Sequence, residues 1–536
     1  MLSYRKLAMR VLGRPLHTGG IDSPRPASQR AAAFILTAAM LTTLAAPAFA
    51  EIWHIEDGDI TVKAGETGND VTQKGTTTYG DTDTIITNSD KNTASSHTVT
   101  IETNDKNDKV EVTLKDVNID TSSRNNAAVS VTGEGDTNIK LDGDNALKSD
   151  TYRSGIYGSG SGSLTISGGE NDSLTAQGGS GANGISSSGS LTISGGTVTA
   201  NGDDGGRGIS SSGSVTISGG STVTANGGSG TISGGDGICS SGGVTISGGS
   251  TVTANGGNGG SLVGGDGIRS GGGLTVSDGT VTAKGGNGDS KDGYGGDGIR
   301  SGGVVTISGN TVNAAGGYGG KVGGYGICSF DRVAISGGTV EAAGGNGSTG
   351  GGSGIYSSVI DLSGSLELTA KAGSPTGKAL LQNGHELNLD DIKEKLGPGA
   401  KVTATDANGE TKQVSIPRPV EPEESSSSSD GGSATPSAPA SPLPGLTVTD
   451  KDGQRISYTS TQSGNTLTVC VGRFTASFRI SLAALRQLRA EGIDTITFQT
   501  ILCSTTLSVD ELLAMGGEDA EAVLTHRLTD SSLTVG

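Results

Sequence analysis

Three aspartates recur at the same place in a repeated motif. Asp236, Asp266 and Asp297 each stand directly before the dipeptide Gly-Ile. If the repeats stack as strands, these carboxylates lie one above another, about 5 Å apart. Carboxylates this close repel one another, and a calcium ion, which prefers oxygen ligands, would relieve the repulsion. The pattern predicts a calcium site; the alternative is a turn in which each aspartate caps its own backbone.

Four tyrosines gather near the same motifs. Tyr294, Tyr318 and Tyr325 lie between repeated segments, and Tyr356 follows one repeat later. An aromatic ring can stack on the apolar face of a sugar, and the phenol can bond to its hydroxyl groups. The chain has only 9 tyrosines, so their concentration here favours a carbohydrate-binding edge. Ordinary exposed tyrosines are the alternative.

Evidence for catalysis is thin. Arg269 and Arg300 occupy equivalent outward positions next to the aspartates. An arginine beside a calcium-bound uronate would resemble the arrangement in a lyase, whereas the simpler interpretation is that both arginines neutralise the aspartates. None of the histidines lies in the repeats, and neither a Ser-His-Asp set nor a zinc-ligand spacing is present. We therefore assign no catalytic residue.

The elements that must position these side chains come from a repeat of about 28 residues. Each unit carries a Gly-Ile segment and two more, such as Leu274-Thr-Val and Thr280-Val-Thr-Ala. Apolar residues alternate with threonine, which is the pattern of a strand with one buried face. Glycines between the segments are expected at corners that need a positive φ. The Gly-Ile dipeptides begin at residues 155, 184, 208, 237, 267, 298, 326 and 354.

Three such short strands can form one turn of a three-sided coil, and the inward side chains are buried only when coils stack. We predict an all-β fold, a right-handed parallel β-helix, followed by a small α+β domain. Equivalent residues then form ladders, among them Asn201, Asn226 and Asn255. A disordered linker and a calcium-binding nonapeptide roll are the alternatives, but phased strand segments and the long period disfavour them.

The repeat defines the domain organisation. Upstream alternating segments predict the first coils and an N-terminal cap, and Leu366-Glu-Leu-Thr-Ala predicts the last clear coil strand. Asp390 to Lys395 is expected to be a short helix of the C-terminal cap. The expected regions are a signal peptide at 1–50, the β-helix at 51–412, a Pro/Ser-rich linker at 413–445 and the α+β domain at 446–536.

Cysteine usage does not indicate a disulfide scaffold. Cys239 and Cys328 fill the same position three coils apart, about 14 Å at strand spacing, which is too far for a bridge. Cys470 and Cys503 both lie in the C-terminal domain, and whether they pair is left open.

The N-terminus predicts export. A basic segment precedes an apolar stretch from Ala31 to Ala46, and Ala48-Phe-Ala resembles a signal-peptidase site. The stretch is short for a membrane span, so we expect cleavage after Ala50 and no membrane insertion afterwards; an uncleaved anchor is the alternative. The protein is then secreted or held at the cell surface.

Composition excludes other classes. The 95 glycines follow no collagen period, and the net charge of −18 with no basic patch excludes a nucleic-acid partner. No feature of the sequence indicates an oligomeric state.

A family resemblance adds to this interpretation. The segments Val112-Thr-Leu-Lys-Asp-Val-Asn-Ile, Ala128-Val-Ser-Val, Asp144-Asn-Ala-Leu, Gly155-Ile-Tyr and Leu164-Thr-Ile-Ser-Gly-Gly resemble the secreted clostridial carbohydrate-binding β-helix family. The resemblance covers roughly residues 80–400. It implies a fold similar to that of pectate lyases and binding of plant cell-wall polysaccharides and calcium.

We therefore expect a secreted, non-catalytic polysaccharide-binding protein, with calcium as its candidate cofactor. A structural adhesin or stalk that presents the C-terminal domain is one alternative. A calcium-dependent polysaccharide lyase is the other.

Overall fold

The computed structural model describes residues 51–309, 311–417 and, with short gaps, 445–535. The predicted signal peptide, most of the predicted linker and Cys503 lie outside the described residues. The chain divides into two compact units, residues 1–421 and 422–536. In the described part of the chain, no helix has the length and apolar character needed to cross a bilayer.

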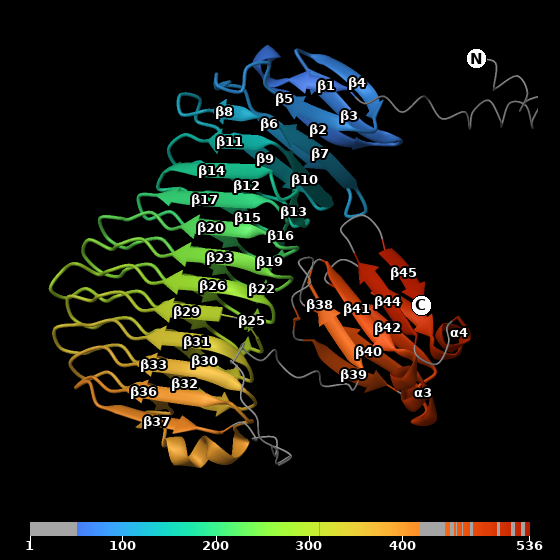
Figure 1. Ribbon diagram of the computed structural model, residues 1–536. Coiled ribbons are helices and arrows are strands. Elements are labelled where there is room, and N and C mark those ends of the chain that lie inside the picture. The colour runs from blue at the N-terminus through green and yellow to red at the C-terminus, as the bar shows by residue number, and fades with distance from the viewer. Residues whose placement is uncertain are drawn as a thin grey trace, which may run out of the picture. The chain divides into compact units, whose positions relative to one another are not determined.

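The first unit is a parallel β-helix of about 13 turns, which confirms the predicted fold class (Figure 1). Each coil contributes three short strands, and each strand pairs in parallel with its equivalents in the coils before and after. The pairing keeps the register of the sequence repeat. Ile238, for example, pairs with Ile268, which pairs with Ile299. The strands therefore form three rows along the axis.

The first row contains the Gly-Ile segments, and Arg269 and Arg300 lie at outward positions on two of its short strands. Its members are β6 (Val99–Thr103), β9 (Val129–Gly133), β12 (Ile156–Gly158), β15 (Ile185–Ser187), β18 (Ile209–Ser211), β21 (Ile238–Ser240), β24 (Ile268–Ser270), β27 (Ile299–Ser301), β30 (Ile327–Ile335), β32 (Ile355–Leu362) and β34 (Leu380–Gln382).

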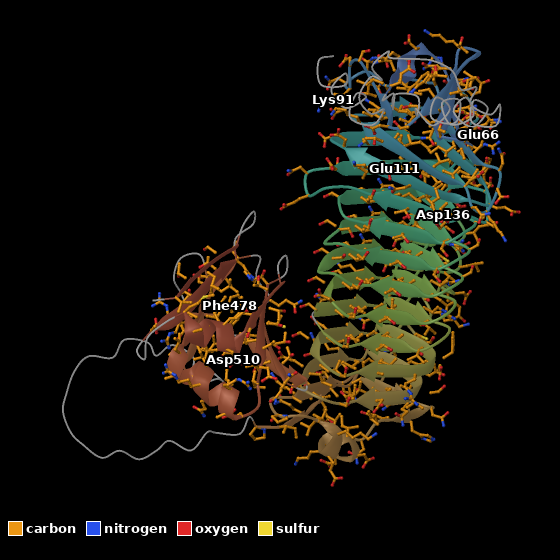
Figure 2. All side chains as sticks on the ribbon, turned by 90° about the vertical axis from the view of Figure 1, so that its right-hand side faces the viewer. Glu66, Lys91, Glu111, Asp136, Phe478 and Asp510 are labelled. Carbon is orange, nitrogen blue, oxygen red and sulfur yellow. The ribbon has the colours of Figure 1, made fainter. Side chains whose placement is uncertain are left out.

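The second row follows after a Ser- or Gly-containing corner, and charged side chains such as Glu111 and Asp136 project outward from its first strands (Figure 2). Because β30 and β32 are long, they belong to both rows. The row consists of β5 (Thr84–Thr87), β7 (Lys109–Lys115), β10 (Asp136–Asp142), β13 (Leu164–Ser167), β16 (Leu191–Ser194), β19 (Val215–Ser218), β22 (Val244–Ile246), β25 (Leu274–Val276) and β28 (Val305–Ile307), and ends on β30 and β32.

The third row contains the Thr-Val-Thr-Ala segments, visible as stacked arrows in Figure 1. It extends one coil beyond the predicted last strand, because β36 pairs in parallel with β33. Its strands are β8 (Asn118–Asp120), β11 (Asp144–Lys148), β14 (Ser173–Ser180), β17 (Thr197–Asp203), β20 (Thr222–Asn226), β23 (Ser250–Asn255), β26 (Gly279–Lys284), β29 (Thr311–Ala315), β31 (Gly338–Ala343), β33 (Leu366–Lys371) and β36 (Lys401–Thr405).

Antiparallel strands close both ends of the solenoid. At the start, β2 (Ile60–Gly65), β3 (Gly68–Gln73) and β4 (Thr76–Asp81) form a meander, preceded by β1 (Ile52–His54) and the 3-10 helix η1 (Ile55–Asp57). At the other end are β35 (His385–Glu386), β37 (Thr411–Ser415) and the 3-10 helix η2 (Leu389–Lys395). The last confirms the short helix predicted for the C-terminal cap. Strand β37 also carries the solenoid past residue 412.

The core is a single column of aliphatic side chains. In one coil the five inward residues predicted from alternation are fully buried: Ile268, Leu274, Val276, Val281 and Ala283. Burying one large aliphatic side chain contributes roughly 1.5–3 kcal/mol, and only neighbouring coils can provide that burial. Stacking is therefore what stabilises each coil.

Glycine serves two purposes, and the sequence predicted only one of them. At inner corners such as Gly195 the backbone has the expected positive φ, here 87°. In the long loops (227–236, 256–266, 285–297 and 316–325) the reason is close approach instead. A Cβ on Gly265 would lie 1.9 Å from the carbonyl oxygen of Gly235 in the preceding coil. These glycines therefore let neighbouring loops pack backbone against backbone.

Direct hydrogen bonds make the long loops part of the stack. Gly265 donates its N–H to Gly257 across its own loop, and Gly286 of the next loop donates to Gly265, both at 2.8 Å. Parallel bridges also join Gly230, Gly259 and Gly288 on three successive loops. The loops thus form an ordered layer that extends the solenoid. They project from the same edge of successive coils (Figure 1).

The predicted asparagine ladder is confirmed. Asn226 Nδ2 donates to Asn201 Oδ1, and Asn255 Nδ2 donates to Asn226 Oδ1, each at 2.8 Å. Amide groups stacked in this way satisfy one another along the axis.

The described residues of the second unit form two four-stranded sheets and two short helices. Ser481 and Ser508 cap α3 (Leu482–Ala490) and α4 (Val509–Ala514), because each serine hydroxyl accepts an N–H of the first helical turn. One sheet contains β38 (Leu446–Thr449), β41 (Ala476–Ser481), β44 (Glu521–His526) and β45 (Ser531–Val535). The other contains β39 (Thr459–Ser463), β40 (Thr466–Cys470), β42 (Thr495–Gln499) and β43 (Ser504–Ser508).

Candidate functional site

The three predicted aspartates form a ladder at the corner where each long loop returns to the first row. We call Asp236, Asp266 and Asp297 the aspartate ladder. Each of the three residues is at most 5% exposed. Asp266 N–H donates to Asp236 Oδ1 at 2.9 Å, and Asp297 N–H donates to Asp266 Oδ1 at 2.8 Å. Each carboxylate therefore binds the backbone of the next coil rather than its own.

Arginines pair with the other oxygen of each carboxylate. Arg269 Nε lies 2.9 Å from Asp266 Oδ2, and Arg300 Nη1 lies 3.2 Å from Asp297 Oδ2. Arg207 Nε lies 3.2 Å from Asp236 Oδ2. This geometry matches the charge-compensating interpretation of Arg269 and Arg300. Arg207 was missed, although it stands before Gly208-Ile209 and so occupies the same corner position as the aspartates.

Burial and a neighbouring aspartate raise the pKa of two members of the ladder. Burial, followed by the neighbouring carboxylate of Asp266, raises the pKa of Asp297 to about 7. Burial and then Asp236 also raise the pKa of Asp266. Burial alone would lower the pKa of Arg269, but Asp236 and Asp266 outweigh it and the net shift is upward. A guanidinium held protonated in this way is unsuited to act as a general base.

The geometry provides no ready-made cation site at the ladder. Each Oδ1 accepts a backbone N–H and each Oδ2 faces a guanidinium. Across the described residues, no three His, Cys, Asp or Glu side chains cluster in a way that could hold a metal ion. Calcium at Asp236, Asp266 and Asp297 stays a prediction.

A cavity of about 580 Å³ opens beside the first step of the ladder, and we call it the arginine cavity. Arg207, Asp236 and Arg269 contribute its charged side chains, and Asn183 lies at one side. The remaining lining is mostly glycine backbone from the returning legs of neighbouring loops. The sequence did not reveal this cavity, because its walls are backbone.

Two of the predicted tyrosines form a stacked pair further along the same corner. The rings of Tyr325 and Tyr356 lie 5.1 Å apart with an interplanar angle of 16°. Tyr325 occupies the aspartate position of its coil, and its N–H donates to Asp297 Oδ1 at 2.7 Å. Tyr356 occupies the outward position that Arg269 and Arg300 hold in earlier coils.

Phe330 joins this group and was missed by the sequence analysis. Its ring is 54% exposed, and the guanidinium carbon of Arg300 lies 5.2 Å from the ring centroid. Phe330 stands two residues after Cys328 on β30, so its side chain points outward as well. We call Tyr325, Phe330 and Tyr356 the aromatic edge.

Tyr294 and Tyr318 lie elsewhere, on the long loops. Tyr294 is 43% exposed, and Lys321 Nζ lies 5.7 Å from its ring centroid. Tyr318 is 47% exposed, and its N–H donates to Asn287 Oδ1. The four predicted tyrosines therefore form two groups rather than one platform.

Of the two cysteines in the first row, Cys328 is buried and Cys239 is partly buried. Strand register places Cys239 and Cys328 three coils apart, with Arg269 and Arg300 between them, and both thiols are free. Burial raises the pKa of Cys239 to about 11 and that of Cys328 to about 12. Cys470 is also free in the described part of its domain.

Comparison with known proteins adds nothing to this geometry. No family model, curated protein or solved structure shows significant similarity to the chain.

Proposed function

We propose that the solenoid is a non-catalytic polysaccharide-binding protein and that the glycan lies along the corner from the arginine cavity to the aromatic edge. The observation that carries this proposal is the aromatic edge. Phe330 is exposed beside the Arg300 guanidinium, and Tyr325 and Tyr356, on the same coil and the next, stack on each other. Aromatic rings with hydrogen-bonding groups at their margins suit the mixed apolar and hydroxylated surface of a sugar.

The spacing of the coils suits an extended polymer. Successive coils are about 4.8 Å apart, so equivalent side chains repeat at roughly the length of one sugar residue in an extended chain. From Arg207 to Tyr356 the corner offers a guanidinium or a ring on most coils. Because the loops are hydrogen-bonded to one another, these groups are held in place before a ligand arrives, which lowers the entropic cost of binding.

The same geometry supports binding rather than cleavage. In the described part of this corner, the three aspartates are buried and ion-paired, and the arginines are bound to them. A lyase needs a free base beside the sugar, and this edge presents none among its described residues. We infer that the protein acts outside the cell, on the basis of the predicted signal peptide.

The test is a glycan array probed with the purified chain, followed by affinity measurements on the retained glycans. A double variant, Phe330→Ala with Tyr356→Ala, should weaken binding about tenfold or more, since one stacked ring contributes about 1 kcal/mol. Tyr79→Ala is the matched control, because Tyr79 is 75% exposed in the N-terminal cap.

Three results would contradict the proposal. Absence of binding to any glycan would favour a structural stalk. Unchanged affinity of the double variant would move the site away from the aromatic edge, and Tyr294→Ala with Tyr318→Ala would then test the loops. New absorbance at 235 nm with pectins would identify a lyase.

A further inference from the structure

The arginine cavity has features that a neutral sugar does not require. Two guanidinium groups, from coils two apart, converge on one carboxylate oxygen. The Nε atoms of Arg207 and Arg269 lie 3.2 and 3.6 Å from Asp236 Oδ2. Asp236 itself is almost completely buried, whereas the two arginine side chains are 42% and 45% exposed. The two guanidinium groups are therefore much more exposed to the cavity than the Asp236 carboxylate, which also lines it.

Each arginine has its outer edge free. Arg207 uses Nε for Asp236, and Arg269 uses Nε for Asp266. No described residue accepts a hydrogen bond from the Nη atoms of either side chain. The carboxylates, in turn, are occupied by backbone N–H groups and by the Nε atoms. Two unsatisfied guanidinium edges thus flank a cavity of about 580 Å³.

We propose that this cavity binds a tetrahedral oxyanion ester, specifically a sulfate ester carried by the polysaccharide. A carboxylate has two oxygens in one plane, and one guanidinium edge satisfies both. A sulfate ester keeps three free oxygens that point in different directions, so one group can bridge two guanidinium edges. The inference rests on the proposed function, because the ester arrives as part of the glycan.

The walls of the cavity favour a compact anion. They are largely glycine backbone, so no side chain prevents a substituent from approaching the arginines. The lining glycines are Gly181, Gly205, Gly206, Gly234, Gly235, Gly264 and Gly265.

The charge of the whole chain makes this site selective. At −18, the protein repels polyanions at long range, so a sulfated polymer gains affinity only where a local site outweighs the repulsion. Binding through general attraction of a basic surface is therefore excluded as an explanation. The preference for sulfate should depend on these two arginines.

The experiment compares chondroitin sulfate with chemically desulfated chondroitin, which keeps the same uronate carboxylates. Calorimetry on the full chain should show at least tenfold tighter binding of the sulfated polymer. Arg207→Gln should abolish most of that preference. Arg207→Lys keeps the charge but loses the planar pair of donors, and should retain only a small part of it. Arg153→Gln is the control, because Arg153 is exposed on an earlier coil.

Each outcome decides a different point. Equal affinity for the two polymers overturns the sulfate inference but leaves polysaccharide binding intact. A sulfate preference that survives Arg207→Gln, with unchanged melting temperature, also overturns it. A phosphorylated mannan that binds more tightly than chondroitin sulfate, relative to its dephosphorylated form, would identify a phosphate ester instead. If every glycan fails on the array, the proposed function fails with it.

Discussion

The aspartate ladder predicts an unusual dependence of stability on pH. Asp297 has a pKa of about 7 in the folded chain, against an ordinary value of 3.8 for an aspartate side chain. The folded state therefore holds this proton more tightly than the unfolded state does. Below about pH 4 the carboxyl is protonated in both states, and between pH 4 and 7 only the folded state keeps the proton. Stability must then fall as pH rises through this window.

The magnitude follows from the size of the shift. A difference of about 3 pKa units, at 1.36 kcal/mol per unit, corresponds to about 4 kcal/mol between pH 4 and pH 8. Asp297→Asn removes the ionisation but keeps an oxygen that accepts the N–H of Tyr325. Arg300 loses its partner but remains partly exposed to water. We therefore expect the variant to be more stable than the parent chain at pH 8 by up to about 4 kcal/mol, and similar to it at pH 4.

Urea denaturation of the parent chain and the variant at pH 4, 5.5, 7 and 8.5 measures this difference. The contributions of groups that do not interact with Asp297 cancel when the two proteins are compared at each pH, whereas Asp266, which interacts with Asp297, adds to the difference. Asp289→Asn makes the same change of charge at an exposed loop position and should leave the profile unchanged. A variant that is less stable than the parent chain at pH 8, or a difference that does not vary with pH, would refute the reasoning.

Three further predictions concern the stack and the ladder. Gly265→Ala should lower the free energy of unfolding by about 2 kcal/mol or more, because the new Cβ would lie 1.9 Å from a carbonyl oxygen. Gly158→Ala is the control and should lower it far less, because the nearest atom to its Cβ would lie 3.4 Å away. Urea denaturation measures both values. Asn226→Ala breaks two amide hydrogen bonds and should cost about 2 kcal/mol, with glycan affinity unaffected. If the arginines alone neutralise the ladder, EDTA should change neither the melting temperature nor glycan affinity. A melting temperature that falls on chelation would instead establish the predicted calcium site.

Much of the fold could be predicted because the same strand pattern recurs in the sequence of every coil of a solenoid. The alternation in Val252-Thr253-Ala254 predicts a strand with Val and Ala inward, and both are fully buried. The spacing of the Gly-Ile dipeptides predicts the register, and Ile238, Ile268 and Ile299 pair as expected. Period and alternation are local properties, so one chain suffices to reveal them.

The site was less accessible to sequence reasoning for physical reasons. Stacking of the aspartates followed from the repeat, but the partner of each carboxylate oxygen depends on side-chain direction. From the sequence, Asp266 could cap its own turn, bind a cation or accept a hydrogen bond from the next coil, and the structure shows that it accepts the N–H of Asp297. The role of Gly265 was also hidden, because a close approach between loops leaves no pattern beyond the glycine itself.

A solenoid site is best sought by comparing equivalent positions of successive coils rather than neighbours in the chain. Aligned on Gly-Ile, the outward position of the first row reads Tyr157, Ser186, Ser210, Cys239, Arg269, Arg300, Cys328 and Tyr356. Parallel register makes each of these residues a spatial neighbour of the next. Small hydroxyl side chains suffice to keep an outward strand position soluble, so the change to arginine and tyrosine is not required by the fold. The corner position changes over the same coils, from Asn183 through Arg207 and the aspartate ladder to Tyr325. The outward position and the corner position are neighbours, and both depart from the repeat over the same coils, which indicates one binding surface. The arginine cavity and the aromatic edge lie along this surface.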